Sequence, residues 1–417
     1  MSNKLQRHKL SSLIDVKRGQ SLSGDYYASE GEYIRLTLAN FDYVNGGFKY
    51  DSQKSDLYYT GPIKQECLLK KGDIITPLTE QALGLLGSTA RIPESNKFVQ
   101  SGDVALVTCK DGLIDPDFCY YLLPSKQVKK QLAAGSQQTK IRHTSPDAIK
   151  ACVVDIPDYE QQKQIGKFLS LIDRKIAINR AINQNLEALA KQLYDYWFVQ
   201  FDFPNEEGKP YKSSGGKMLW NESLKRYIPE AWSNGTFSEI ANITMGQSPD
   251  GSSYNENGNG SIFYQGSTDF GIRFPSVRMY TTSPSRFAKK GDILMSVRAP
   301  VGAVNIANTD CCIGRGLSAI NSKIGSITYV YYVVHYLKVR FDRLNAAGTT
   351  FGAITKDDLF DLPVVIPNEN VIKCFEAICK PIFDKQMKIG YEIEQLTALR
   401  DELLPLLMNG QVSIQNQ

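Results

Sequence analysis

Few residues of this chain are spaced for catalysis. Asp158 follows a proline, and Asp173 and Lys175 come later with one residue between them. This order matches, as text, the Pro-Asp and Asp-x-Lys strings of nucleases, in which carboxylates and a lysine converge on a metal ion. Here Asp173 and Lys175 lie between Ile172 and Ile176, inside the apolar repeat of a long predicted helix. A nuclease site normally draws these groups from a strand and its neighbour, so we assign no nuclease activity.

Other catalytic and metal-binding patterns are missing from the sequence. Adenine methyltransferases of one class need an Asn/Asp-Pro-Pro-aromatic tetrapeptide, and the 417 residues contain no Pro-Pro pair. The sequence also contains no Walker A loop, the phosphate-binding motif of many nucleotide-binding enzymes. The 8 cysteines form no Cys-x-x-Cys pair, and the 3 histidines are too scattered for a zinc site. The sequence therefore predicts no catalytic residue, no metal site and no cofactor in this chain.

The stretch from Asp158 to about Gln200 predicts one long helix. Neither glycine nor proline interrupts Lys167 to Phe203. At 1.5 Å per residue this helix would extend for roughly 60 Å, so its apolar stripe needs a partner of similar length. The seven-residue steps of the stripe are Ile165, Ile172, Asn179, Leu186 and Leu193, and Phe168, Ile176, Ile182 and Leu189 fill most of the steps between them.

The chain supplies such a partner 210 residues later. Its stripe is Phe375, Ile382, Ile389, Leu396 and Leu403, all apolar. We expect the two helices to pair antiparallel, because each runs away from its own domain. Asn179 stands where the second copy has Ile389, and a polar residue at such a position often fixes the register of a helix pair. The alternative is a solvent-facing asparagine at a helix irregularity.

The regions before the two helices also repeat. A shared skeleton with divergent loops is typical of two binding modules for different targets, whereas a duplicated structural domain that drifted freely is the alternative. Three short motifs return: Gly19-Gln20-Ser21 as Gly246-Gln247-Ser248, Lys70-Lys71-Gly72-Asp73-Ile74 as Lys289-Lys290-Gly291-Asp292-Ile293, and Ala133-Ala134-Gly135 as Ala346-Ala347-Gly348.

Both repeated regions read as mixed β and α structure. In the first we expect strands at Glu32–Leu36, Asp73–Ile75 and Val104–Thr108 and helices at Asp117–Leu123 and Gln127–Ala134. The predicted organisation is a first domain at residues 1–157, a helix at 158–200, a polar linker at 201–228, a second domain at 229–367, and a second helix with the tail at 368–417.

Composition limits the class of protein. The net charge is +4, so a nucleic-acid surface must come from local basic patches. The longest apolar run, Ile327 to Leu337, is too short to span a membrane, and no secretory segment precedes Lys4, Arg7 and Lys9. We expect a reduced cytoplasmic protein with no membrane contact.

Several motifs carry a more specific resemblance. They resemble motifs of the type I restriction-modification specificity subunits and occur in the same order along the chain as in that family. Together they span essentially the whole chain. The motifs are Ile172-Asp173-Arg174-Lys175-Ile176, Asn183 to Ala190, Tyr196-Trp197-Phe198-Val199, Phe201-Asp202-Phe203-Pro204, Ile228-Pro229-Glu230-Ala231-Trp232, and the tail Leu399 to Gly410.

The resemblance implies a subunit without catalytic activity. Each variable region would be a target recognition domain that reads one half of a split, asymmetric site in double-stranded DNA. The helices would act as a spacer and help to dock two methyltransferase subunits, which bind S-adenosylmethionine. Two motor-nuclease subunits that use ATP and magnesium would then join. A scaffold that organises protein partners without reading DNA is the alternative.

For DNA reading, base edges require Arg, Lys, Asn and Gln on loops or helix ends, and phosphates require Lys, Arg and backbone N–H groups. Two places suit this: the loop after the Ala-Ala-Gly motif and the stretch after the Gly-Asp-Ile strand. Ordinary solvated surface is the alternative for any single residue. The candidates are Thr79, Gln81, Arg91, Gln137, Gln138, Lys140 and Arg142 in the first copy, and Arg298, Arg315, Thr349 and Thr350 in the second.

The predicted fold class is therefore α/β (α+β), with two repeated mixed α/β recognition domains bridged by two long antiparallel helices.

Overall fold

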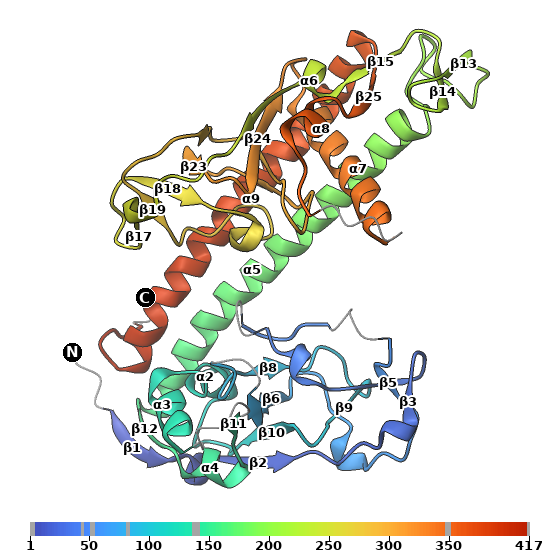
Figure 1. Cartoon of the computed structure of the whole chain (residues 1–417). Coiled ribbons are helices and arrows are strands. Elements are labelled where there is room, and N and C mark those ends of the chain that lie inside the picture. Colours follow the sequence, from blue (N-terminus) through green and yellow to red (C-terminus); the bar gives the residue numbers. More distant parts are fainter. Residues whose placement is uncertain are drawn as a thin grey trace. The chain divides into compact units, whose positions relative to one another are not determined.

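The computed structural model describes residues 5–42, 46–50, 55–80, 84–135, 142–346 and 352–414. The chain forms two compact units, one made of Met1–Ala177 with Gln395–Gln417 and the other of Ile178–Glu394. Each unit contains one mixed α/β domain and parts of two long helices, α5 (Tyr159–Tyr194) and α9 (Glu369–Met408) (Figure 1). The prediction of two mixed α/β domains joined to long helices is confirmed.

The first domain is built on two four-stranded sheets. One has the order β2-β10-β6-β8 and the other β3-β5-β4-β9, while β1 pairs with β12 and β7 with β11. The strands are β1 (Gln6–Lys9), β2 (Ile14–Arg18), β3 (Tyr27–Ala28), β4 (Tyr33–Arg35), β5 (Tyr58–Tyr59), β6 (Ile74–Pro77), β7 (Thr79–Glu80), β8 (Ala90–Arg91), β9 (Phe98–Val99), β10 (Val104–Cys109), β11 (Arg142–His143) and β12 (Val153–Ile156). The helices are α1 (Leu10–Leu13), α2 (Pro116–Leu122), α3 (Lys126–Gly135) and α4 (Pro146–Ala151).

The second domain repeats this plan. Its central sheet, β16-β24-β21-β22, matches β2-β10-β6-β8, and its second sheet has the order β17-β19-β18-β23-β20. The strands are β15 (Ser233–Thr236), β16 (Ala241–Met245), β17 (Tyr254–Asn255), β18 (Ser261–Tyr264), β19 (Tyr280–Thr281), β20 (Phe287–Ala288), β21 (Ile293–Ser296), β22 (Val304–Ile306), β23 (Cys311–Ile313), β24 (Leu317–Ser322) and β25 (Pro363–Ile366). The helices are α6 (Phe237–Ile240), α7 (Ile327–Ala346) and α8 (Lys356–Phe360).

The long helices bury one stripe against each other and against their domains. In the second unit they run antiparallel, because Asn179 Nδ2 donates to Glu392 Oε2 at 2.9 Å while Asn183 Nδ2, one turn further along α5, donates to the Gln386 carbonyl at 3.3 Å. Asn179 is only 2% exposed, so the solvent-facing alternative is wrong for this residue. Of the expected stripe, Ile165, Ile172, Asn179, Phe375 and Ile389 are buried, and Leu186, Leu193, Ile382, Leu396 and Leu403 are half-buried.

Of the predicted steps between these positions, Ile176 is buried as expected and Phe168 is half-buried, but Ile182 and Leu189 are not buried. The buried residues are Leu169, Ile176, Asn183 and Ala190, whereas Ile182 is 40% exposed and Leu189 is 55% exposed. At about 100° per residue, a step of four from Ile165 or Asn179 returns within about 40° of the stripe, but a step of three falls about 60° short of a full turn. The stripe therefore follows the four-residue steps.

Residues 201–228, expected to be a polar linker, are packed at two points. Phe201 and Phe203 are buried in the same hydrophobic cluster as Trp232, and the Phe203 ring stacks on the Trp232 ring with centroids 4.7 Å apart. The segment then forms a hairpin of β13 (Met218–Asn221) and β14 (Arg226–Pro229). Within the described residues, no helix is both long and apolar enough to cross a membrane.

Candidate nucleic-acid interface

In the first domain, the structure brings together two stretches that the sequence separates widely. Strand β7 pairs with β11, so that Thr79 lies opposite His143 and Glu80 lies opposite Arg142. We call these four residues the first rim. Gln81 and the residues Gln137, Gln138 and Lys140 lie outside the described residues, directly before or after this pair of strands in the sequence. Thr79 and Arg142, one from each candidate stretch of the first domain, therefore lie on paired strands.

The side chains of the first rim differ in how freely they can reach a ligand. Thr79 is buried, and its Oγ1 donates to Asp103 Oδ1 at 3.0 Å. Glu80 is also buried and accepts the Gly84 and Leu85 amides at 2.6 and 2.9 Å. Arg142 is half-buried, with Nη1 3.8 Å from Glu80 Oε2, a separation too long for a hydrogen bond. Arg142 and the exposed His143 are thus the described side chains of this rim that can reach a ligand.

The second domain has the same arrangement at the equivalent place. Arg298 forms a bridge with Ala353, and the Val297 amide donates to the Gly316 carbonyl while the Ile354 amide donates to Val297. These are the counterparts of two first-domain bonds, from Leu78 to Asp103 and from Thr144 to Leu78. We call Arg298 and Ala353 the second rim; Thr349 and Thr350 lie outside the described residues. Arg298 is exposed and pairs with none of the described carboxylates, so it can donate outward.

Arg315 lies at a different place in the second domain, beside a surface cavity of about 550 Å³. The Ser248 hydroxyl accepts the Arg315 amide at 3.2 Å and Gln265 Nε2 at 3.0 Å, and Asp269 is buried against Arg278. Gln265 and Arg278 are not among the candidates predicted from the sequence, because nothing in their local sequence pattern indicates a binding role. The cavity combines amide, guanidinium and carboxylate groups, which are the groups that read base edges.

Arg91 does not reach the first rim. Arg91 pairs with Ile74, the first residue of β6, whereas Thr79 lies two residues beyond Pro77, the last residue of that strand. Its guanidinium bonds to Asp117 and lies 4.9 Å from the centre of the Tyr120 ring. Arg91 is therefore held against α2 within the domain.

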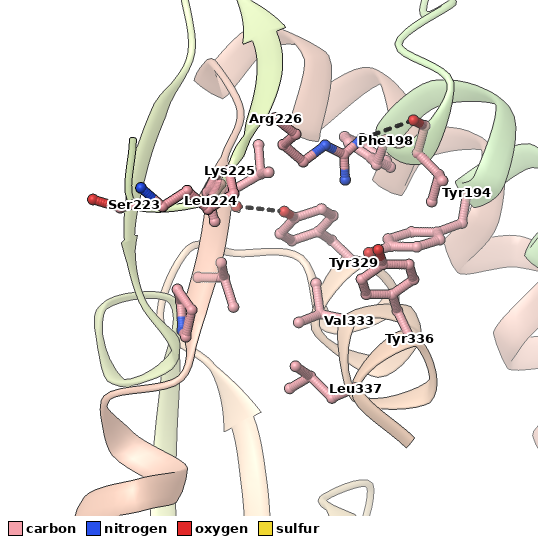
Figure 2. A pocket seen from close by; sticks show the side chains of 14 residues that line it. Tyr194, Phe198, Ser223, Leu224, Lys225, Arg226, Tyr329, Val333, Tyr336 and Leu337 are labelled. Atoms are coloured by element: carbon pink, nitrogen blue, oxygen red, sulfur yellow. Dashed lines mark hydrogen bonds between the residues drawn. The ribbon is translucent and has the colours of Figure 1, made fainter. Parts of the chain in front are cut away.

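The second unit also contains a cavity of about 340 Å³ between the β13–β14 hairpin, α7 and β25 (Figure 2). Tyr329 Oη donates to the Val365 carbonyl at 2.7 Å, and Arg226 Nη2 donates to the Val199 carbonyl at 2.8 Å. Burial raises the pKa of the Tyr194 hydroxyl well above its usual value. The residues that line the cavity include no carboxylate, histidine or cysteine. This arrangement suits packing of the hairpin rather than acid–base chemistry.

The described residues also contain no group of three or more histidine, cysteine, aspartate or glutamate side chains able to hold a metal ion.

The sequence of this chain matches a known protein family over most of its length. A family model described as "Type I restriction modification DNA specificity domain" matches residues 3–188 and 229–399. The putative type I restriction enzyme MjaX specificity subunit of Methanocaldococcus jannaschii is 33% identical over 86% of this chain and 83% of its own. The HindI specificity subunit of Haemophilus influenzae is 22% identical over 96% and 98%.

A solved structure has a similar fold. It is the S subunit of a type I restriction-modification system from M. genitalium, with a TM-score of 0.60 and 19% identity, and the match covers 98% of this chain and 99% of that one.

Proposed function

Because this chain belongs to the type I restriction-modification DNA specificity family, we propose that it is the subunit that selects the DNA target of such a system. Each domain reads one half of a bipartite, asymmetric site through its rim. The observation that carries this proposal is the equivalent position of the two rims in two repeated domains. Their side chains differ, with Thr79 in one and Arg298 in the other, which suits two readers of different half-sites.

We propose that the chain has no catalytic activity of its own. The sequence offers no methyltransferase tetrapeptide and no phosphate-binding loop, so adenine methylation and DNA cleavage belong to partner subunits. S-adenosylmethionine, ATP and magnesium are then cofactors of those partners. With a net charge of only +4, the isolated chain should bind DNA weakly.

Partner docking is supported by a second apolar stripe in the second unit. Ile178, Ile182 and Leu189 on α5, and Tyr196 in the turn of π-helix that follows (Asp195–Val199), are all exposed. Their spacing of four, seven and seven residues places them along one face of a helix. We propose that this face contributes to docking the two methyltransferase subunits, with two motor-nuclease subunits completing the restriction complex.

The decisive experiment combines the chain with its methyltransferase subunit. The complex should methylate adenines only within one split, asymmetric sequence, mapped on a genomic DNA substrate. Binding to that sequence should exceed binding to random duplex by at least about a thousandfold, as for other specific readers. Equal binding to both, or methylation without sequence preference, would favour the scaffold function instead.

A further inference from the structure

One arginine of the second domain is buried among the long helices. Arg273 lies in the loop closed by the Phe270–Pro275 bridge and is only 8% exposed. Its Nη1 donates to Glu187 Oε2 on α5 at 3.1 Å and to Tyr331 Oη on α7 at 3.1 Å. Its guanidinium also lies 4.6 Å from the centre of the Phe383 ring on α9. A single side chain of the domain thus touches all three helices.

This contact is not arranged for maximal stability. The Nε and Nη2 atoms of Arg273 are buried and have no hydrogen-bond partner among the described residues. Removing such groups from water is costly, and well-packed apolar side chains often stabilise a core as well or better. In some proteins, however, a buried charge held by directional hydrogen bonds favours a single arrangement of the elements that carry it. Glu187 is itself held in place, because its Oε2 also accepts Gln386 Nε2 at 2.9 Å.

The first unit has a related cluster at the equivalent place. Tyr121 on α2 stands 210 positions before Tyr331, the same offset that relates the two helix stripes. Its hydroxyl donates to Asp173 Oδ2 on α5 at 2.6 Å, and Arg400 Nη1 on α9 donates to Asp173 Oδ1 at 2.9 Å. In both units a tyrosine of the domain thus lies beside an arginine–carboxylate pair, but in the first unit this pair joins the two long helices, whereas in the second unit Arg273 joins the domain to α5.

The neighbouring residue explains why the second domain also needs a directional contact. Phe274 is buried against α9, where a Cβ atom on Gly390 would lie 2.6 Å from Phe274 Cε2. Glycine at this position thus lets the loop approach the helix closely. Apolar contact of this kind holds the surfaces together but does not by itself fix their orientation.

We propose that Arg273, with Glu187 and Tyr331, is a positioning residue that fixes the orientation of the second recognition domain on its helices. The orientation in turn determines how strictly the complex selects the gap between the two half-sites. The part of this inference that concerns DNA rests on the proposed function; the part that concerns orientation does not.

Two sets of changes test the inference. Tyr331→Phe removes only a hydroxyl group and keeps the ring, while Arg273→Met combined with Glu187→Leu removes both charges without leaving either one unpaired. Tyr336→Phe, an exposed tyrosine on the same helix, is the matched control. Thermal unfolding of each variant shows whether it is folded.

The first readout uses the full chain without DNA. Nitroxide labels at Thr282 in the domain and Lys388 on α9, both exposed, report a distance within the second unit; Cys374, also exposed, is replaced by serine. The distance distribution should be broader in Tyr331→Phe and in the double variant than in the parent, and unchanged in the control. Unchanged widths in folded variants would overturn the inference, whatever the chain does with DNA.

The second readout is methylation by the complex with its methyltransferase subunit, on targets with the native gap and with one base pair more or less. The preference for the native gap should fall about tenfold in Tyr331→Phe, since one hydrogen bond to a charged group is worth about one order of magnitude. An equal loss on all three targets would mean a purely structural role and would overturn the positioning role. A parent complex with no gap preference would instead refute the proposed function, while the label distances still decide the orientation.

Discussion

The sharpest test of the rims is Arg298→Ala. Arg298 is exposed, and its backbone is held by the bridge to Ala353, so loss of its side chain should leave the fold intact. If the guanidinium contacts a phosphate, the substitution removes one released counterion. The slope of log affinity against log salt concentration should then become shallower by about 0.9.

This slope has a measurable size. Between about 50 and about 200 mM salt, the ratio of parent to variant affinity should shrink roughly 3.5-fold, and the loss should be the same on every sequence. If Arg298 instead contacts a guanine, the slope stays nearly unchanged. Discrimination at one base pair of the second half-site should then fall by about 1–3 kcal/mol, or roughly 5- to 150-fold.

The assay is a salt series of fluorescence-anisotropy titrations on the specific target and on a random duplex, with the methyltransferase subunit present. Lys323→Ala is the control, since it removes one positive charge just beyond the far end of β24, at roughly 20 Å from the rim. That distance exceeds the screening length of about 8 Å at physiological salt. If Arg298→Ala matched Lys323→Ala in affinity, slope and specificity, the second rim would not contact DNA.

Replacing residues 229–367 with the equivalent region of a relative should change one half-site in a methylation map; a change in both halves would contradict independent domains. Phe375→Ala should lower the free energy of unfolding, measured by urea titration, by about 3–5 kcal/mol. The reason is that the Phe375 ring is fully buried and packs against Trp197 and Phe198. A loss below about 1 kcal/mol would show that the site repacks. Burial lowers the pKa of His335, so the unfolded chain binds a proton more readily than the folded chain. The free energy of unfolding should therefore fall as the pH drops below about 6.5. His335→Phe should remove this part of the pH dependence, and a stability profile identical to that of the parent would contradict the prediction.

The long helices and the repeat were predictable because their signals are local or periodic. The apolar spacing of α5 and α9 and the three returning motifs need no knowledge of tertiary contacts. In the first domain, the expected strands near β4, β6 and β10 and the helices near α2 and α3 are present, with ends shifted by at most two residues. The polar composition of residues 201–228 did not indicate the burial of Phe201 and Phe203, because an average over the segment conceals two aromatic residues that alternate with a polar one.

The site could be predicted only in part, since its geometry depends on contacts between distant residues. The pairing of β7 with β11 joins strands of two residues each, too short to leave a periodic pattern. The burial of Thr79 and the engagement of Arg91 with Asp117 arise from the same long-range packing. The contact of Arg273 with Glu187 joins residues 86 positions apart and has no local signature.

The exposed apolar face of α5 has a consequence for the cell that makes this chain. Ile178, Ile182, Leu189 and Tyr196 present a helical stripe to water, and such exposed apolar stripes promote association between copies when nothing covers them. Self-association rises steeply with concentration. Under the proposed docking of the methyltransferase subunits on this face, each bound partner would cover the stripe, and the amount of unaggregated chain would be limited by the supply of those subunits.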